Sequence, residues 1–556
     1  MDENNSTPLH HAALRGQVGM VEQLLMNGAL FRATDKDKNT PLHLAVWKSH
    51  TDVVELLLDR GASIRARNIH FQTSLHLAAW TGHIGVMELL LRKFAPIEAR
   101  NRYKNTALHL AALKGHAGVV ELLLRQGASV YAVANSNTPL HLAARGGHTD
   151  ATKLLLEKGA YIQVRNNCRN SPLHLAAWNG QTDVVKLLLS KGAIIQDWNT
   201  SRNTSLHLAA WNGQADVVEL FLSTGVQIDI RNRDHNAALH LAASEGHAGV
   251  VGLLLWAGAE VEATGEDRST PLHLAAQKGH SDVVELLLRK GALIEAKNQY
   301  KNTPLHLAAS QGHSDMVELL LENGASIEAS GENGNTSLHF ATQSGYTGTT
   351  KLLLERGALI QAGTKYRNTP LHLAVWYDQT DVVELLLSKG AQIDPRNRHN
   401  NAPLHLAASK GHAGVLELLL GAGAEIEAIG VERSTPLHLA TQKGHTGMVE
   451  LLLGKGASPE AKNTNNDTPL HIAARAGNAN VVELLLRKGA SIEALNNSKR
   501  TPLHLAAKKR HTGTIQLLQN HAMKPVHETV HDANLRDKEG GDDMYNPESR
   551  HYAECV

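Results

Sequence analysis

Histidine is the residue type with the clearest chemical potential in this chain, which has 34 histidines among 556 residues. An imidazole can bind a metal ion, and it can move a proton near neutral pH. Sixteen of these histidines recur 33 residues apart, with a single step of 32 residues. These motif histidines are His10, His43, His76, His109, His141, His174, His207, His240, His273, His306, His339, His372, His405, His438, His471 and His504. So regular a spacing indicates a repeating fold unit rather than one catalytic or metal site.

Most of the other histidines also follow the period. Ten of them stand seven residues after a motif histidine: His50, His83, His116, His148, His247, His280, His313, His412, His445 and His511. The remaining eight form no metal-ligand spacing with the two cysteines, Cys168 and Cys555. We therefore predict no metal centre and no cofactor.

Catalytic motifs are not visible in the sequence. Nucleophilic catalysis needs a Ser or Cys beside a base, and phosphate chemistry needs a glycine-rich loop of the P-loop or kinase type. The 46 glycines stand largely at repeated turn positions. Only 33 residues lie outside the periodic part, whereas a catalytic domain needs about 100. The sequence predicts a protein that is not an enzyme.

Each repeat begins with T-P-L-H or a close variant, which predicts the start of a helix. Thr suits the N-cap, and Pro suits the first helical position because its missing N–H has no partner there. A Gly-His step such as Gly82-His83 then ends this helix, and V-V-E-L-L-L predicts a second, amphipathic helix. A Gly-Ala pair leads into an extended hairpin turn. Since one repeat cannot bury its apolar face alone, neighbouring repeats must stabilise each other.

Residues 303–330, TPLHLAASQGHSDMVELLLENGASIEAS, resemble the ankyrin repeat. The resemblance covers sixteen copies, from residue 1 to about 523, which we expect to form one array. It implies an all-α, elongated and curved solenoid of stacked helix-turn-helix units with β-hairpin loops, in which the Thr and His side chains of the motif pair. Residues 524–556 lack the period and apolar content and are predicted to be a polar, disordered C-terminal tail.

Three repeats depart from the pattern in ways that predict lower local stability. Ala237 and Ala402 replace the capping Thr in repeats eight and thirteen, at a cost of roughly 1 kcal/mol each. Asp378-Gln379 replaces Gly-His in repeat twelve.

Charge and composition exclude several partner classes. Lys and Arg number 55 against 54 acidic residues, which does not favour nucleic acid or an anionic membrane surface. The apolar runs are too short to span a bilayer, the first twenty residues show no secretory signal, and two cysteines fit a reducing compartment. We expect a soluble cytoplasmic protein without direct membrane insertion.

Five of the seven tryptophans occupy the position four residues after a motif histidine, which in ankyrin proteins faces the concave groove. In repeats two to seven this position holds Trp47, Trp80, Leu113, Arg145, Trp178 and Trp211, and in repeat twelve it holds Trp376. Trp and Arg often dominate binding energy, so we predict a protein-binding groove here. Two alternatives remain: repeats six and seven share LAAWNGQ, which indicates duplication without selection for binding, or the indoles cover neighbouring side chains.

The tips of the predicted hairpins form a second candidate surface. Tyr103, Tyr300 and Tyr366 are each followed by Lys or Arg. Such a row of aromatic and basic tips fits an acidic partner, and it equally fits a solvated edge.

The predicted function is a monomeric, non-catalytic scaffold or adaptor that binds proteins, including extended peptide segments, along the groove and the hairpin edge. One alternative is the substrate-recognition subunit of a ubiquitin ligase, although no convincing box motif is visible. The other is a linker between membrane proteins and the cytoskeleton, although the spectrin-binding and death domains of the ankyrins proper are absent.

Overall fold

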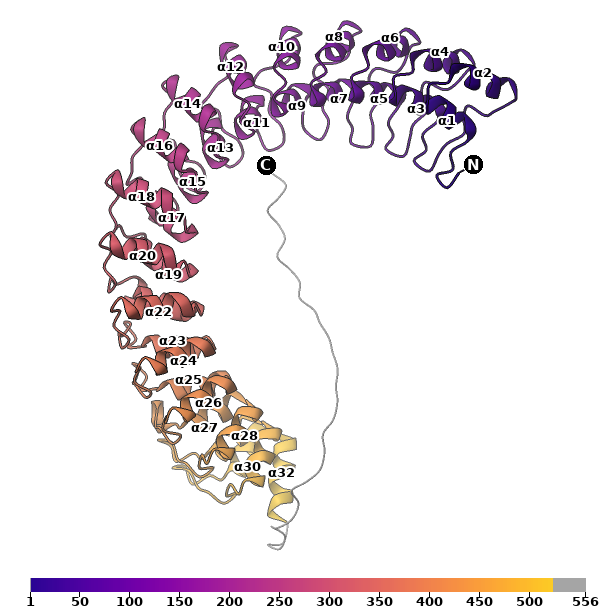
Figure 1. The fold of residues 1–556 in the computed structure, drawn as a ribbon. Helices are drawn as coiled ribbons and strands as arrows, with labels where there is room; N and C mark the ends of the chain where they lie inside the picture. Colours follow the sequence, from indigo (N-terminus) through magenta and orange to yellow (C-terminus); the bar gives the residue numbers. More distant parts are fainter. Residues whose placement is uncertain (1, 524–556) are drawn as a thin grey trace. The chain divides into compact units, whose positions relative to one another are not determined.

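The computed structural model describes residues 2–523, so the predicted tail, 524–556, lies outside the described residues. The chain divides into two compact units. Unit 1 is Met1–Ala275 with Asp282–Ala292, and unit 2 is Ala276–Ser281 with Leu293 onward. Both units are built from the same pair of helices, repeated along the chain (Figure 1).

The first helix of each repeat begins directly after the Thr, Ser or Ala that opens the motif, as the sequence predicts. Thr40, for example, has extended backbone angles, and Pro41 is the first helical residue. These first-layer helices are α1 (Pro8–Leu14), α3 (Pro41–Trp47), α5 (Ser74–Thr81), α7 (Ala107–Lys114), α9 (Pro139–Gly146), α11 (Pro172–Trp178), α13 (Ser205–Trp211), α15 (Ala238–Ser244), α17 (Pro271–Lys278), α19 (Pro304–Gln311), α21 (Ser337–Ser344), α23 (Pro370–Trp376), α25 (Pro403–Lys410), α27 (Pro436–Lys443), α29 (Pro469–Ala476) and α31 (Pro502–Lys509).

The second helix of each repeat follows a sharp turn. Gly82, for example, ends α5 in the left-handed region at φ 81°, and His83 precedes the next helix. These second-layer helices are α2 (Val18–Met26), α4 (Thr51–Asp59), α6 (Ile84–Arg92), α8 (Ala117–Arg125), α10 (Thr149–Glu157), α12 (Thr182–Ser190), α14 (Ala215–Ser223), α16 (Ala248–Trp256), α18 (Ser281–Arg289), α20 (Ser314–Glu322), α22 (Thr347–Glu355), α24 (Thr380–Ser388), α26 (Ala413–Gly421), α28 (Thr446–Gly454), α30 (Ala479–Arg487) and α32 (Thr512–Ala522).

Within each unit the two kinds of helix form two layers (Figure 1). First-layer helices pack on first-layer helices of the neighbouring repeats, as α5 does on α3 and α7, and each also packs on its own second-layer helix. The paired alanines, such as Ala78 and Ala79, are fully buried and let adjacent helices approach closely. The Val-Val and Leu positions of the second layer complete the core. Apolar side chains are therefore buried both within each repeat and between neighbouring repeats.

The loops between repeats turn like hairpins but form no β-strand within residues 2–523. The loop of repeat two is closed by hydrogen bonds from Asn68 N–H to the Gln72 carbonyl (3.0 Å) and from Phe71 N–H to the Asn68 carbonyl (2.9 Å). An isolated β-bridge joins Ala134 to Asn137, in the loop between His109 and His141, the two motif histidines that are 32 residues apart. Three loops contain short 3₁₀ helices: η1 (Glu266–Arg268), η2 (Glu332–Gly334) and η3 (Val431–Arg433).

Candidate protein-binding surface

The motif histidines hold the repeats together. His76 Nδ1 lies 3.1 Å from the Thr73 backbone nitrogen and 2.9 Å from Thr73 Oγ1, while Nε2 lies 3.0 Å from the Asn105 carbonyl oxygen in the next repeat. Because a carbonyl can only accept, Nε2 carries the hydrogen and Nδ1 accepts from the Thr N–H and hydroxyl. The predicted Thr–His pairing is present, and His76 also joins two repeats through its Nε2.

Burial keeps His76 and nine other motif histidines neutral near pH 7. His76 is 1% exposed, and desolvation lowers its pKa to about 4, against the weaker opposing effect of its bond to the Asn105 carbonyl. A protonated imidazole carries a hydrogen on both ring nitrogens, so its Nδ1 could no longer accept the hydrogen bonds from Thr73. Among the described residues, no group of three or more His, Cys, Asp or Glu side chains is arranged to hold a metal ion.

A second polar ladder runs through the bases of the loops. Asn68 Nδ2 donates to Asn39 Oδ1 of the preceding repeat at 3.1 Å, and Asn199 Nδ2 donates to Asn170 Oδ1 at 2.9 Å. Near the C-terminal end of unit 2 an aspartate, Asp467, takes the corresponding place. These links hold each loop in register with its neighbour and so fix where the loop tips lie.

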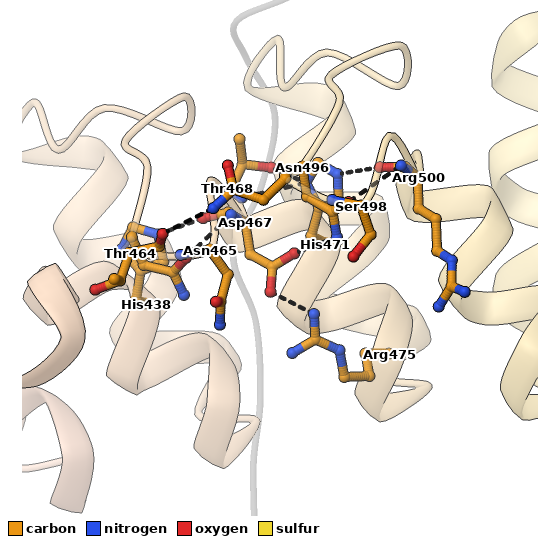
Figure 2. Close-up of polar contacts among 12 residues, drawn as sticks. His438, Thr464, Asn465, Asp467, Thr468, His471, Arg475, Asn496, Ser498 and Arg500 are labelled. Carbon is orange, nitrogen blue, oxygen red and sulfur yellow. Dashed lines mark hydrogen bonds and ion pairs between the residues drawn. The ribbon is translucent and has the colours of Figure 1, made fainter.

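Asp467 connects this ladder to a basic residue of the first layer (Figure 2). Its carboxylate is 1% exposed, accepts from Asn496 Nδ2 at 2.8 Å, and forms an ion pair with the Arg475 guanidinium. Its backbone carbonyl accepts from His438 Nε2 at 3.1 Å. Arg475 is thus oriented by a buried carboxylate, while its own side chain stays 43% exposed.

In unit 1 the predicted groove residues lie at the ends of consecutive first-layer helices. Trp47 is 42% exposed, and Arg145 on α9 is exposed. Leu113, Trp80, Trp178 and Trp211 are partly buried. We call Trp47, Trp80, Arg145, Trp178 and Trp211 the unit 1 row.

Neighbouring side chains cover part of this row. The Trp178 and Trp211 rings pack edge to face, with centroids 5.5 Å apart. Trp80 packs against the hydrophobic core, and Lys114 Nζ lies 4.0 Å from its ring centroid. The alternative that the indoles cover neighbouring side chains therefore applies in part to these three, whereas Trp47 is the most exposed tryptophan of the row.

The three predicted tip tyrosines lie at the loop tips and are exposed: Tyr103 by 54%, Tyr300 by 43% and Tyr366 by 41%. Each precedes a basic residue with a left-handed backbone, such as Lys104 at φ 62°. These basic residues therefore hold, without glycine, the left-handed backbone that Gly334 has at φ 73° in its own loop, where Asn333 is left-handed as well.

One cleft in unit 2 joins the two predicted surfaces. The groove residue Trp376 and the tip residue Tyr366 line a common cavity of about 370 Å³. Its other lining residues are Asn368, His372, Leu373, Tyr377, Asn397, His399, Asn401 and Leu406. We call it the Trp376 cleft.

Several residues of these surfaces were not predicted from the sequence. Lys410 Nζ lies 3.8 Å from the Trp376 ring centroid, as Lys114 does over Trp80. Both lysines stand five residues after a motif histidine, in the repeat that follows one with a groove tryptophan. This spacing was the sequence signal that could have identified them. Trp198, outside the predicted register, has the Cζ atoms of Arg169 and Arg202 at 5.3 and 5.6 Å from its ring centroid.

A comparison with protein-family models agrees with this repeat architecture. The family model "Ankyrin repeats (3 copies)" matches residues 1–68, 67–134, 132–199, 194–265, 239–331, 327–397, 393–463 and 437–529. The crystal structure of the human ASB11 ankyrin repeat domain is 33% identical, with 40% of this chain and 100% of that chain covered and a TM-score of 0.38. A search of curated proteins found no match. Because the family model covers nearly the whole chain, this protein belongs to the ankyrin-repeat family.

Proposed function

We propose that this protein is a non-catalytic, cytoplasmic scaffold or adaptor that acts as a monomer and binds partner proteins through its first-layer helices and loop tips. Ankyrin repeats are protein–protein interaction modules, which supports the general class of function. No helix of the described residues is both long and apolar enough to cross a membrane.

The observation that carries the proposal is the partial exposure of the unit 1 row. Large aromatic side chains with one face against the protein and one face in solvent are typical anchors of protein interfaces. Trp47 offers such a face, and Arg145 on α9 adds a guanidinium that can pair with a carboxylate.

The test compares Trp47→Ser and Arg145→Ala with Trp256→Ser as a matched control. Trp256 is in the same unit and is 83% exposed, but it ends the second-layer helix α16. Partners captured with the full chain are purified, and their dissociation constants are measured with each variant.

We expect Trp47→Ser and Arg145→Ala each to weaken binding at least about tenfold and Trp256→Ser less than about twofold, because hot spots concentrate binding energy in a few residues. Equal weakening by Trp256→Ser, or unchanged binding by the unit 1 variants, would contradict the proposal. Trp80→Ala is a poorer test, since truncating its ring also removes packing against the core.

A further inference from the structure

The Trp376 cleft is built by two loops and two helices of unit 2. Arg398 N–H donates to the Tyr366 carbonyl at 2.8 Å, and Asn397 Nδ2 donates to Asn368 Oδ1 at 3.0 Å. These bonds join the loops 364–368 and 397–401 as two walls. Helix α23 contributes Leu373 and Trp376, and α25 contributes Leu406. The cleft therefore lies between two loops that are hydrogen-bonded to each other and two helices that pack together.

Its lining combines apolar and aromatic side chains with the amides of Asn368, Asn397 and Asn401. Tyr366, Trp376, Tyr377 and His399 are all exposed, and Trp376 is 41% exposed. A cavity of about 370 Å³ is large enough for one bulky apolar side chain of a partner. Trp376 is the one groove tryptophan whose helix directly follows a loop that carries one of the three tip tyrosines.

Several basic side chains stand around the cleft. Lys365, Arg367 and Arg398 stand beside the lining residues Tyr366 and His399 and are exposed, and Lys410 covers part of Trp376. No carboxylate lines the cleft. The acidic residue that follows α23, Asp378, lies 3.5 Å from His412 Nδ1.

The positive surface continues along the first layer of unit 2. Lys410, Lys443, Arg475 and Lys508 are exposed, one on each of α25, α27, α29 and α31, and these four helices contain no Asp or Glu. Arg475 is paired with the buried Asp467, so its charge is partly compensated. The other three form a row of cations that would attract an acidic chain.

We propose that the Trp376 cleft binds an extended acidic peptide segment of a partner protein, with one bulky apolar side chain in the cleft and carboxylates over Lys410 and the basic loop residues. A methylated lysine would suit the aromatic walls, but the surrounding cations disfavour it. This inference rests on the proposed scaffold function and names a partner class for a surface outside the unit 1 row.

The probe is a fluorescent peptide of Glu and Asp around one central Phe, bound to the full-length protein and followed by fluorescence anisotropy. Matched peptides carry Ala or trimethyl-lysine in place of Phe, or Lys in place of the acidic residues. We expect the Phe peptide to bind at least tenfold more tightly than each of the others, and more weakly as salt rises from 50 to 500 mM. Equal binding of the Ala peptide would overturn the proposal. Tighter binding of the trimethyl-lysine peptide or of the Lys-rich peptide than of the Phe peptide would overturn it too.

The protein variants are Tyr366→Ala and Lys410→Glu, with Lys455→Glu as control. Both test residues are exposed, so neither change removes core packing, and Lys455 is an exposed lysine of the same unit that follows the second-layer helix α28. We expect each test variant to weaken binding at least tenfold and the control less than twofold. A control that weakens binding equally would indicate a non-specific charge effect and overturn the site.

The chain itself contains an aromatic residue among acidic ones, Tyr545 in the segment D-D-M-Y-N-P-E at 542–548. If Tyr545→Ala raises the affinity for the Phe peptide tenfold or more, the occupant is this segment rather than a partner, and the assignment to a partner fails. If the peptide does not bind while the unit 1 variants lose their partners, this inference fails and the proposed function stands.

Discussion

Phe94 occupies a backbone position that suits glycine. It stands where most repeats have the Gly of the Gly-Ala pair, and it adopts φ 61°, whereas Gly61 and Gly127 adopt 92° and 85°. A left-handed backbone costs an L-residue roughly 1–2 kcal/mol because Cβ approaches the following carbonyl oxygen. The side chain is 88% exposed, so packing does not offset this strain.

We predict that Phe94→Gly raises the free energy of unfolding by about 1 kcal/mol, since the relief of strain exceeds the extra entropy of glycine in the unfolded chain. Phe94→Ala keeps the Cβ and should leave stability nearly unchanged. Urea unfolding of the three proteins measures the effect. Equal stabilisation by the Ala variant would show that removal of the exposed ring, rather than of strain, is the cause.

The first-layer helices start with a polar arrangement that two repeats lack in part. Thr106 Oγ1 lies 2.8 Å from His109 Nδ1, whereas Ala237 and Ala402 retain only the backbone N–H bond to His240 and His405. The ring nitrogen His240 Nε2 also has no hydrogen-bond partner. The helices α15 and α25 nevertheless form, because the Ala side chains are fully buried against their neighbours.

We predict that Ala237→Thr and Ala402→Thr each stabilise the local helix by about 1 kcal/mol, because the hydroxyl supplies the missing hydrogen bond to the imidazole. Hydrogen–deuterium exchange of residues 238–244 and 403–410 should slow. The converse change, Thr106→Ala, should accelerate exchange in α7. Unchanged exchange in all three variants would contradict a stabilising role for the hydroxyl.

The repeated histidines give the molecule as a whole a pH dependence. Burial lowers the pKa to about 4 in ten of them: His43, His76, His109, His141, His174, His207, His240, His339, His372 and His405. In the unfolded chain an imidazole has a pKa near 6.5. Between pH 6.5 and 4 the unfolded chain therefore binds more protons than the folded chain.

We predict that the folded state is most stable above about pH 6.5 and loses stability progressively as the pH falls from 6.5 to 4. Each unit of pKa difference corresponds to about 1.4 kcal/mol for a single histidine. The urea midpoint should fall from pH 7.5 to 6.0 and again to 5.0, at constant ionic strength. A midpoint that is unchanged from pH 7.5 to 5.0 would show that these histidines are not held neutral by the fold.

The repeat and its helix boundaries could be predicted because they depend on local chemistry. Thr and Pro select the start of a helix, Gly82 and its equivalents end it, and the fixed period reveals which positions recur. The same argument predicted the positions of the tryptophans and the tip tyrosines. It predicted β-hairpin loops as well, and the loops turn as expected but contain no strand within residues 2–523.

The sequence by itself determined the family, the pairing of helices and the register in which variable side chains occur. The tertiary structure decided which of those side chains remain available. Trp47 stays exposed, Trp178 packs on Trp211, and Tyr366 meets Trp376 in a cleft completed by residues of the next repeat. The reason is physical: exposure and cleft shape depend on side chains about thirty residues apart, which only the stacking of repeats brings together.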